Sequence, residues 1–383
     1  MRPLNNTQAP PINRNESWIR DPNGAFGVWD RWVASTGVPV HEGYFVPDMR
    51  TIEVGWWEER KCNAAFLKLA GFDGICEARV SEIPPGGTTA ELKLAVDEAV
   101  YVIGGRGITT IWNERTGQKT SFEWQENSLF LIPRHHYHQF SNVQGERPAR
   151  LYHYNYLPLI MMGIPDPAYF FNGPMVPTDG SIDMAGLYSE AKQATRLNGA
   201  PGSGNLWMGN FFPDMGAWDK LEAGGHRGAG ARNVALCFPG SPITGHMAFF
   251  GSRTYKKAHR HEPGDSIVIP TGEGFSVLWQ EGREKVFVPW QERSVFVPPN
   301  QWWHQHFNVG SQPARYLAFH VIPGILTYSN LAESVAQNQI EYPDEDPWIR
   351  QTFEAELARR GLTSLMPEGA YEDVNYQWKA IDL

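Results

Sequence analysis

Cysteine is scarce in this chain of 383 residues, which has only Cys62, Cys76 and Cys237. The three show no CxxC spacing and cannot all pair, so a disulfide framework is not expected. Small buried thiols in a reducing compartment are the simpler interpretation. Residues 1–20 are polar and rich in Pro and Asn, without the apolar stretch of a secretory signal. We therefore expect a cytoplasmic protein.

Long apolar runs and an excess of positive charge are also missing. The most apolar short stretch, residues 157–164, is far too brief to span a bilayer. A net charge of −9 argues against a broad nucleic-acid or anionic-membrane surface, which needs clustered Lys and Arg. The 15 Trp, 20 Phe and 14 Tyr supply ample material for a core, while 38 Gly and 29 Pro favour short strands and turns. A globular protein acting on a small molecule is expected.

An internal repeat is the most informative feature that is present. The segments WQENSLFLIPRHHYHQFSN and WQERSVFVPPNQWWHQHFN begin at Trp124 and Trp290, an offset of 166 residues. Further upstream the offset is 167, and one residue of loop length reconciles the two values. The matched pairs include Glu98/Asp265, Gly105/Gly272, Trp112/Trp279, Pro133/Pro299, His138/His304 and Asn142/Asn308. The chain therefore contains two copies of one unit.

Each unit has the pattern of a β barrel or sandwich, with short β-branched or aromatic segments bounded by Gly or Pro. We expect an extension over 1–55, a first barrel over 56–157, a connector over 158–230, a second barrel over 231–325 and a helical tail over 326–383. The connector has a helix-like stretch from Met184 to Arg196. In the tail, a helix from Pro347 to Arg360 is predicted, with acidic residues before it and Gly361 after it.

Three histidines of the second unit have the spacing of a metal site. His259 and His261 are two residues apart, so on a strand their side chains share a face. His304 follows a later strand of the same unit. Three imidazoles suit Fe(II), Zn, Ni or Cu, and an added carboxylate widens the choice to Mn. Strand alternation favours Asp265 over Glu262 as that carboxylate, either as a fourth ligand or as a group that orients an imidazole N–H.

These residues resemble the two motifs of the cupin superfamily, G-x5-H-x-H-x3–4-E-x6-G and P-x-G-x2-H-x3-N. The second unit has His259-x-His261-x3-Asp265-x6-Gly272 and Pro299-x-Gln301-x2-His304-x3-Asn308, with Arg253 and Gln301 in place of two motif glycines. The first unit has Gly86-x5-Leu92-x-Leu94-x3-Glu98-x6-Gly105 and Pro133-x-His135-x2-His138-x3-Asn142. The resemblance implies an all-β protein of two jelly-roll barrels, a bicupin.

The first unit lacks two of the four ligand positions, because Leu92 and Leu94 replace the motif histidines. We expect a metal-free barrel in which Glu98 and His138 hydrogen bond to each other. A site rebuilt from His135, His136 and His138 is the alternative, which strand alternation disfavours because His135 would face away from the other two.

The layout most resembles gentisate-type bicupin dioxygenases, which implies a mononuclear Fe(II) centre, O2 as co-substrate and cleavage of a C–C bond in an aromatic or enolisable substrate. That group usually carries its metal in the first cupin, whereas this chain has its triad in the second. One alternative is a redox-neutral decarboxylase, lyase or isomerase using Mn(2+), Zn(2+) or Ni(2+). A non-enzymatic binding bicupin is the other. Bicupins also often assemble into homo-oligomers.

Substrate contacts are predicted only from position in the second unit. Trp302 and Trp303 are absent from the first unit, and His306, whose counterpart is Phe140, shares a face with His304. The other candidates are Phe275 near the motifs and Arg253, which strand parity would turn inward on an unbroken strand. For Trp279 we expect a barrel-filling role, since its repeat partner lies in the metal-free unit.

Overall fold

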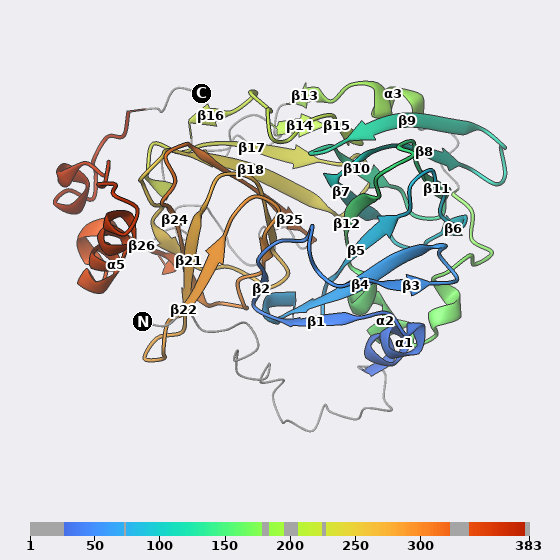
Figure 1. The fold of residues 1–383 in the computed structure, drawn as a ribbon, viewed down its shortest axis with the longest axis horizontal. Helices are drawn as coiled ribbons and strands as arrows, with labels where there is room; N and C mark the ends of the chain where they lie inside the picture. The colour runs from blue at the N-terminus through green and yellow to red at the C-terminus, as the bar shows by residue number, and fades with distance from the viewer. Residues whose placement is uncertain are drawn as a thin grey trace.

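The computed structural model describes residues 27–72, 74–177, 184–194, 206–223, 227–321 and 337–379. Two β-rich lobes lie side by side, the first in blue to green and the second in yellow to orange, with the helical tail in red beyond the second (Figure 1). No helix in these ranges is long and apolar enough to cross a membrane. The three cysteines form no disulfide in the described structure.

Two sheets form the first barrel, and within it each strand pairs antiparallel with its neighbours. The first sheet runs in the order β4 (Cys62–Leu69), β5 (Glu77–Ile83), β12 (Ala149–Asn155), β7 (Glu98–Gly104) and β10 (Leu129–Ile132). The second runs β6 (Leu92–Lys93), β11 (Tyr137–Asn142), β8 (Arg106–Trp112) and β9 (Lys119–Gln125). Side chains that alternate inward along these strands fill the barrel.

The second barrel repeats this order and adds one strand, β26, at the edge of its second sheet. Its first sheet runs β17 (Arg232–Cys237), β18 (Thr244–Phe250), β25 (Ala314–His320), β20 (Ser266–Thr271) and β23 (Val295–Phe296). The second sheet runs β22 (Val286–Trp290), β21 (Gly274–Trp279), β24 (Trp303–Asn308), β19 (Ala258–His259) and β26 (Gln339–Ile340). The predicted all-β fold of two barrels with short helical extensions is confirmed.

The segments before each barrel exchange strands between the two barrels. β1 (Val40–Gly43) pairs parallel with β4, and β2 (Phe45–Val46) then joins β23 of the other barrel. Likewise β14 (Leu206–Met208) pairs parallel with β17, and β15 (Phe211–Phe212) joins β10 of the first barrel. Three short strands extend these sheets: β3 (Gly55–Trp57), β13 (Lys192–Ala194) and β16 (Glu222–Ala223). The segment before each barrel therefore contributes one strand to each of the two barrels. The predicted domain limits stay a prediction.

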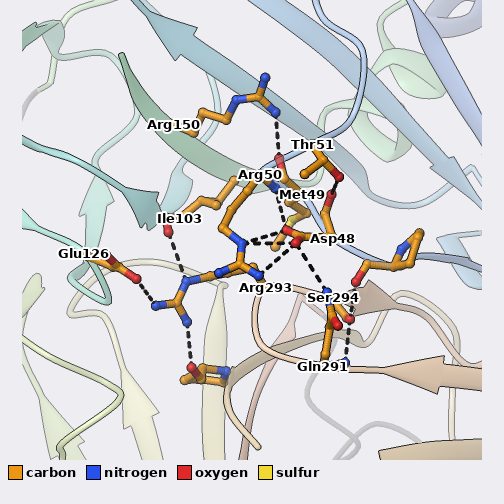
Figure 2. Close-up of polar contacts among 12 residues, drawn as sticks. Asp48, Met49, Arg50, Thr51, Ile103, Glu126, Arg150, Gln291, Arg293 and Ser294 are labelled. Carbon is orange, nitrogen blue, oxygen red and sulfur yellow. Dashed lines mark hydrogen bonds and ion pairs between the residues drawn. The ribbon is translucent and has the colours of Figure 1, made fainter. Parts of the chain in front are cut away.

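Polar contacts of Arg293 join the two barrels where β2 meets β23. Its guanidinium donates to the carbonyl of Ile103 in the first barrel (3.0 Å) and forms an ion pair with Glu126 (Figure 2). Beside it, Ser294 donates to the carbonyl of Pro47 (2.6 Å). Arg293 is only 2% exposed, so its charge is neutralised inside the junction and ties the two lobes together.

Helices cover the outside of the barrels. They are α1 (Val28–Thr36), α2 (Leu157–Gly163), α3 (Met184–Ser189) and α5 (Pro347–Ala358), with 3-10 turns η3 (Ala70–Phe72), η4 (Pro167–Tyr169), η7 (Tyr342–Asp344) and η8 (Glu368–Tyr371). The tail helix matches its prediction, because the Asp346 side chain caps it by accepting from Trp348 N (3.0 Å). Gly361 follows in the left-handed conformation (φ 69°). The connector helix is shorter than predicted, since α3 ends at Ser189 and a strand begins at Lys192.

Left-handed backbone marks the motif positions where the second unit lacks glycine. Arg253 has φ 56° and its counterpart Gly86 has φ 64°. Gln301 has φ 59° and its counterpart His135 has φ 61°. The turns are therefore conserved between the units although the glycines are not, and each non-glycine residue there accepts a strain of roughly 1–2 kcal/mol.

Candidate metal centre

Four imidazoles of the second barrel gather between β19 and β24. His259 lies directly across from His304 in the strand register, with ring centroids 4.2 Å apart. His261 lies 4.6 Å from His304, and His306 lies 5.5 Å from it. The possible ligand atoms of His259, His304 and His306 all fall within 4.8 Å of one another. This is the spacing that a single metal ion requires of a ligand set.

Backbone carbonyls fix the tautomers of three of these rings. Nδ1 lies against the carbonyl of Lys257 for His259 (3.2 Å), of Trp302 for His304 (3.1 Å) and of Glu262 for His261 (2.8 Å). A carbonyl only accepts, so each Nδ1 carries the hydrogen and each Nε2 keeps a lone pair. Nε2 of His304 is buried without a partner among the described residues. These are the features of imidazoles prepared to bind a metal.

His306 is oriented by a hydroxyl group. Its Nδ1 lies 2.8 Å from Ser276 Oγ, which also accepts from Trp290 Nε1 (3.1 Å). The sequence placed His306 only in the substrate-binding group, whereas the geometry makes it a further candidate ligand. The missed signal was its two-residue spacing from His304 on one strand, the same spacing that singled out His259 and His261.

Asp265 contacts one imidazole of the cluster and one beside it. One carboxylate oxygen is 3.2 Å from Nδ1 of His261, and the other is 2.6 Å from Nδ1 of His320. His320 in turn contacts His246 through a nitrogen–nitrogen distance of 2.7 Å. Burial alone would raise the pKa of Asp265, but the two histidines hold it below its ordinary value. Of the two roles considered for Asp265, this geometry favours orienting His261 over direct ligation.

Burial keeps the clustered rings neutral. It lowers the pKa of His259, His304 and His306 well below the ordinary histidine value, and neighbouring positive charge lowers it further. These three side chains are 6%, 0% and 1% exposed. Neutral imidazole is the form that binds a metal, so no proton has to leave before an ion enters.

Two cations lie in the same barrel and were missed by sequence reasoning. Lys256 is 3% exposed and donates to the Tyr316 hydroxyl (2.7 Å). Arg227 donates to the Gln339 side chain (3.2 Å) and is near enough to lower the pKa of His259. Burial, then the charge of Arg227, lowers the pKa of Lys256 to about 7. No carboxylate among the described residues forms an ion pair with either cation, so the interior favours an anionic ligand.

The other predicted substrate contacts lie elsewhere. Phe275 stacks on Phe287 and Phe307 (4.4 and 4.5 Å), on the face of β21 opposite Ser276, in the cluster that α5 covers. Trp279 packs against that cluster instead of inside the barrel.

The two tryptophans of the second motif lie in different surroundings, and Trp302 packs against the apolar cluster of the second barrel. The ring of Trp303 lies under the guanidinium of Arg260 (4.5 Å), and its indole N–H donates to Glu281 (3.2 Å). Trp302 packs near Tyr44 (5.8 Å). Arg253 reaches toward the carbonyl of Thr363 in the tail (3.5 Å). Strand alternation explains why Trp303 lies on the face opposite His304. The left-handed turn at Arg253 breaks the strand parity on which the inward orientation of Arg253 was predicted.

Glu98 and His138 of the first barrel do not hydrogen bond to each other, contrary to the prediction. Glu98 pairs with Arg79 (2.5 Å) and His153 (2.8 Å) and accepts from Asn155 (3.1 Å). The physical reason is Arg79, whose guanidinium also pairs with Glu77 and offers Glu98 a full positive charge. Leu92 and Leu94 are buried, as expected of side chains that bind no metal.

Comparisons with known proteins establish the fold. No protein-family model matches the chain, and no curated protein does. Two variant structures of oxalate decarboxylase from Bacillus subtilis match it at TM-score 0.50 and 12% identity, over 89% of this chain and 88% of theirs. The chain folds as a bicupin. A further structure of the Bacillus subtilis enzyme, concerned with its Mn(II) centres, matches at 0.49 and 12% over the same shares.

At this identity the likeness shows the bicupin fold, and the activity has to be argued from the site. The predicted resemblance to gentisate-type dioxygenases has no counterpart in the two structures that match at TM-score 0.50, and it stays a prediction.

Proposed function

We propose that this bicupin is a metal-dependent enzyme whose second barrel decarboxylates a small carboxylate without net oxidation. The ligands would be His259, His261 and His304, with His306 as a fourth imidazole. The observation that carries the proposal is the pairing of this cluster with the buried Lys256 and the half-buried Arg227, which have no carboxylate partner in the described structure. The fold shared with oxalate decarboxylases supports the same class of reaction.

The residues around the cluster suit this chemistry. A bound divalent ion would act as a Lewis acid toward a substrate carboxylate. Lys256 and Arg227 would hold the negative charge of that substrate and orient it. Decarboxylation breaks the C–C bond next to a carboxylate, releases CO2 and places a proton on the remaining carbon. Nothing in this balance requires an oxidant, in contrast to ring cleavage.

An Fe(II) dioxygenase remains the second candidate, because Asp265 contacts His261 and His320 and thereby leaves an all-histidine ligand set. Three neutral imidazoles suit Fe(II) among other metals, and the resemblance to gentisate-type dioxygenases implies iron. In this case the anionic substrate would be a hydroxylated aromatic acid or a related enolisable carboxylate.

Metal content and product analysis test both proposals. The protein is purified without added metal, beside a His259→Ala/His261→Ala control, and then reloaded with Mn(II) or Fe(II). Release of CO2 from oxalate or another small carboxylate, without O2 uptake, supports the decarboxylase. Oxygen consumption by the iron-loaded protein across hydroxylated aromatic acids and diketones moves the assignment to the dioxygenase. No metal in either protein rejects both, and it leaves the binding bicupin. A cytoplasmic location and a homo-oligomer belong to the same proposal.

A further inference from the structure

The first barrel keeps the arginine of the second at the same place in the fold. The carbonyl of Arg60 accepts from Ala90 N (2.9 Å), and the carbonyl of Arg227 accepts from Lys257 N (3.0 Å). The next residue is left-handed in both cases, with φ 54° at Lys61 and 72° at Gly228. Arg60 and Arg227 are 167 residues apart, and so are Lys61 and Gly228. This is the offset of the upstream part of the repeat. The metal-free barrel has therefore lost two histidines but not this cation.

Arg60 lies against aromatic rings instead of a counter-ion. Its guanidinium carbon is 5.1 Å from the ring centroid of Trp57 and 5.2 Å from that of Phe171. Cation–π contacts use the faces of the guanidinium and leave its N–H edges open. No acceptor or ion-pair partner for these N–H groups is found among the described residues. Burial lowers the pKa of Arg60 to about 10, with the charge of Arg79 adding to the effect and those of Glu98 and Glu59 opposing it.

Two further polar groups nearby have no partner in the described structure. Nε1 of Trp57 is buried without an acceptor, although the ring is 4% exposed. Nδ1 of His138, a residue that is 2% exposed, is also buried and unpaired. Arg60 is close enough for its charge to lower the pKa of His138. Unpaired buried polar atoms are uncommon and costly, and two of them near an arginine without an acceptor point to a ligand that satisfies them.

Carboxylates of the barrel cannot serve as that ligand. Glu98 and Glu77 are both bound to Arg79, and Asn155 donates to each of them (3.1 and 3.3 Å). Leu92 and Leu94 remove the donor atoms that would hold a metal. Arg60 is thus left without an ion pair of its own in the described structure and lies against aromatic rings, a setting that suits a small organic anion.

We propose that the first barrel binds a small carboxylate anion, without a metal, through Arg60, Trp57 and His138. The two carboxylate oxygens would accept from the open edge of the guanidinium, a geometry that arginine provides and lysine does not. The flanking rings of Trp57 and Phe171 favour a planar group over a tetrahedral one. The site does not depend on the activity of the second barrel, so the two proposals can fail separately.

Acetate binding to metal-stripped, full-length protein tests the proposal. An Arg227→Gln background removes the matching cation of the second barrel, and calorimetry then measures acetate, with sulfate as a tetrahedral comparator. We expect saturable binding of one acetate per chain, tighter than sulfate. Adding Arg60→Gln should weaken it at least about 30-fold, the loss expected when one partner of a buried charged pair is removed. Acetate should also change tryptophan fluorescence, because Trp57 lies in the site.

Three results would overturn the site: no saturable acetate binding in the Arg227→Gln protein, equal affinity with and without Arg60→Gln, or tighter binding of sulfate. If Arg60→Gln unfolds the chain, a crystal structure of the Arg227→Gln protein with acetate well above its Kd decides. Acetate within hydrogen-bond distance of the Arg60 guanidinium supports the site. Density for the side chain without acetate beside it rejects the proposal.

Discussion

The two barrels place a carboxylate at the same position of the repeat and give it different partners. In the first barrel Glu98 binds Arg79 and His153. In the second, Asp265 binds His261 and His320. The strand register explains the difference, because Arg79 lies across from His153 on β12 and the matching position on β18 is His246. One barrel fills the site with a guanidinium of its own, and the other surrounds it with imidazole rings.

This comparison shows how a cupin barrel can stay intact where leucines replace two of the motif histidines. A buried carboxylate requires a positive charge, and a guanidinium joined to the chain provides one permanently. Among the described residues of the second barrel, neither Lys256 nor Arg227 forms an ion pair with Asp265. The cluster of unprotonated Nε2 atoms is therefore left for an external ion. The predictions below test this contrast from the largest expected effect to the smallest.

Removal of His304 should abolish metal binding by the second barrel. We expect His304→Ala to lower metal content from about one ion per chain to nearly none, because its ring is central to the cluster. Metal analysis after gel filtration measures this, with His41→Ala as a control at a histidine of the first extension. Retention of a full complement by His304→Ala would place the ion elsewhere.

Removal of Arg79 should destabilise the first barrel without affecting metal content. Arg79→Met leaves Glu77 and Glu98 buried together without their guanidinium, a loss of about 3–5 kcal/mol in the free energy of unfolding. Urea unfolding measures it, with Arg134→Met as the control, since that side chain is 44% exposed.

The same substitution should change how stability depends on pH. In the unmodified protein burial alone would raise the pKa of Glu98, but Arg79 and His153 hold it far below its ordinary value. A lowered pKa contributes stability that is present above the unfolded-state value of about 4.3 and is lost only as the pH falls through the folded-state value. Without Arg79 this contribution shrinks, so the deficit of the variant should be largest near neutral pH and smaller below about pH 4. An equal deficit at both pH values would contradict the ion-pair explanation.

The double repeat and the histidine pair made the fold and much of the site predictable from sequence. Periodic motifs at a fixed offset identify two barrels, and strand parity places His259 and His261 on one face. The strand exchange was missed, although GYFVPDM and GNFFPDM, beginning at Gly43 and Gly209, repeat at the same 166-residue offset.

Contacts between distant strands were beyond the sequence. Arg79 lies outside both motifs, so nothing in the spacing of the motif residues indicated that Glu98 would pair with Arg79 and not with His138. Lys256 and Arg227 come from separate segments, and only the closed barrel brings both near the histidines. The prediction that Phe275 contacts substrate failed for another reason. Proximity to a motif along the chain does not determine on which face of its strand a side chain lies.

Asp265 should affect metal affinity less than a ligand does. Asp265→Asn keeps the shape but removes the charge that orients His261, and a loss of about 10- to 100-fold in metal affinity is typical of such contacts. Competition with a fluorescent chelator measures the metal affinity. The control is Glu262→Gln, which removes the charge of the neighbouring acidic residue. A complete loss of metal, as large as that of His304→Ala, would instead make Asp265 a direct ligand.

The smallest effect is expected where the second barrel departs from the motif glycines. Arg253→Gly should relieve left-handed strain of roughly 1–2 kcal/mol, less about 0.5–1 kcal/mol for the added freedom of glycine in the unfolded chain. A net gain under about 1 kcal/mol corresponds to a rise in Tm of about 1–3 °C for a domain of this size. The reciprocal change in the first barrel, Gly86→Arg, should lower Tm, because it introduces the strain that Gly86 avoids (φ 64°). A fall in Tm for Arg253→Gly would mean that its hydrogen bond to the carbonyl of Thr363 outweighs the strain, and that the tail stabilises this turn.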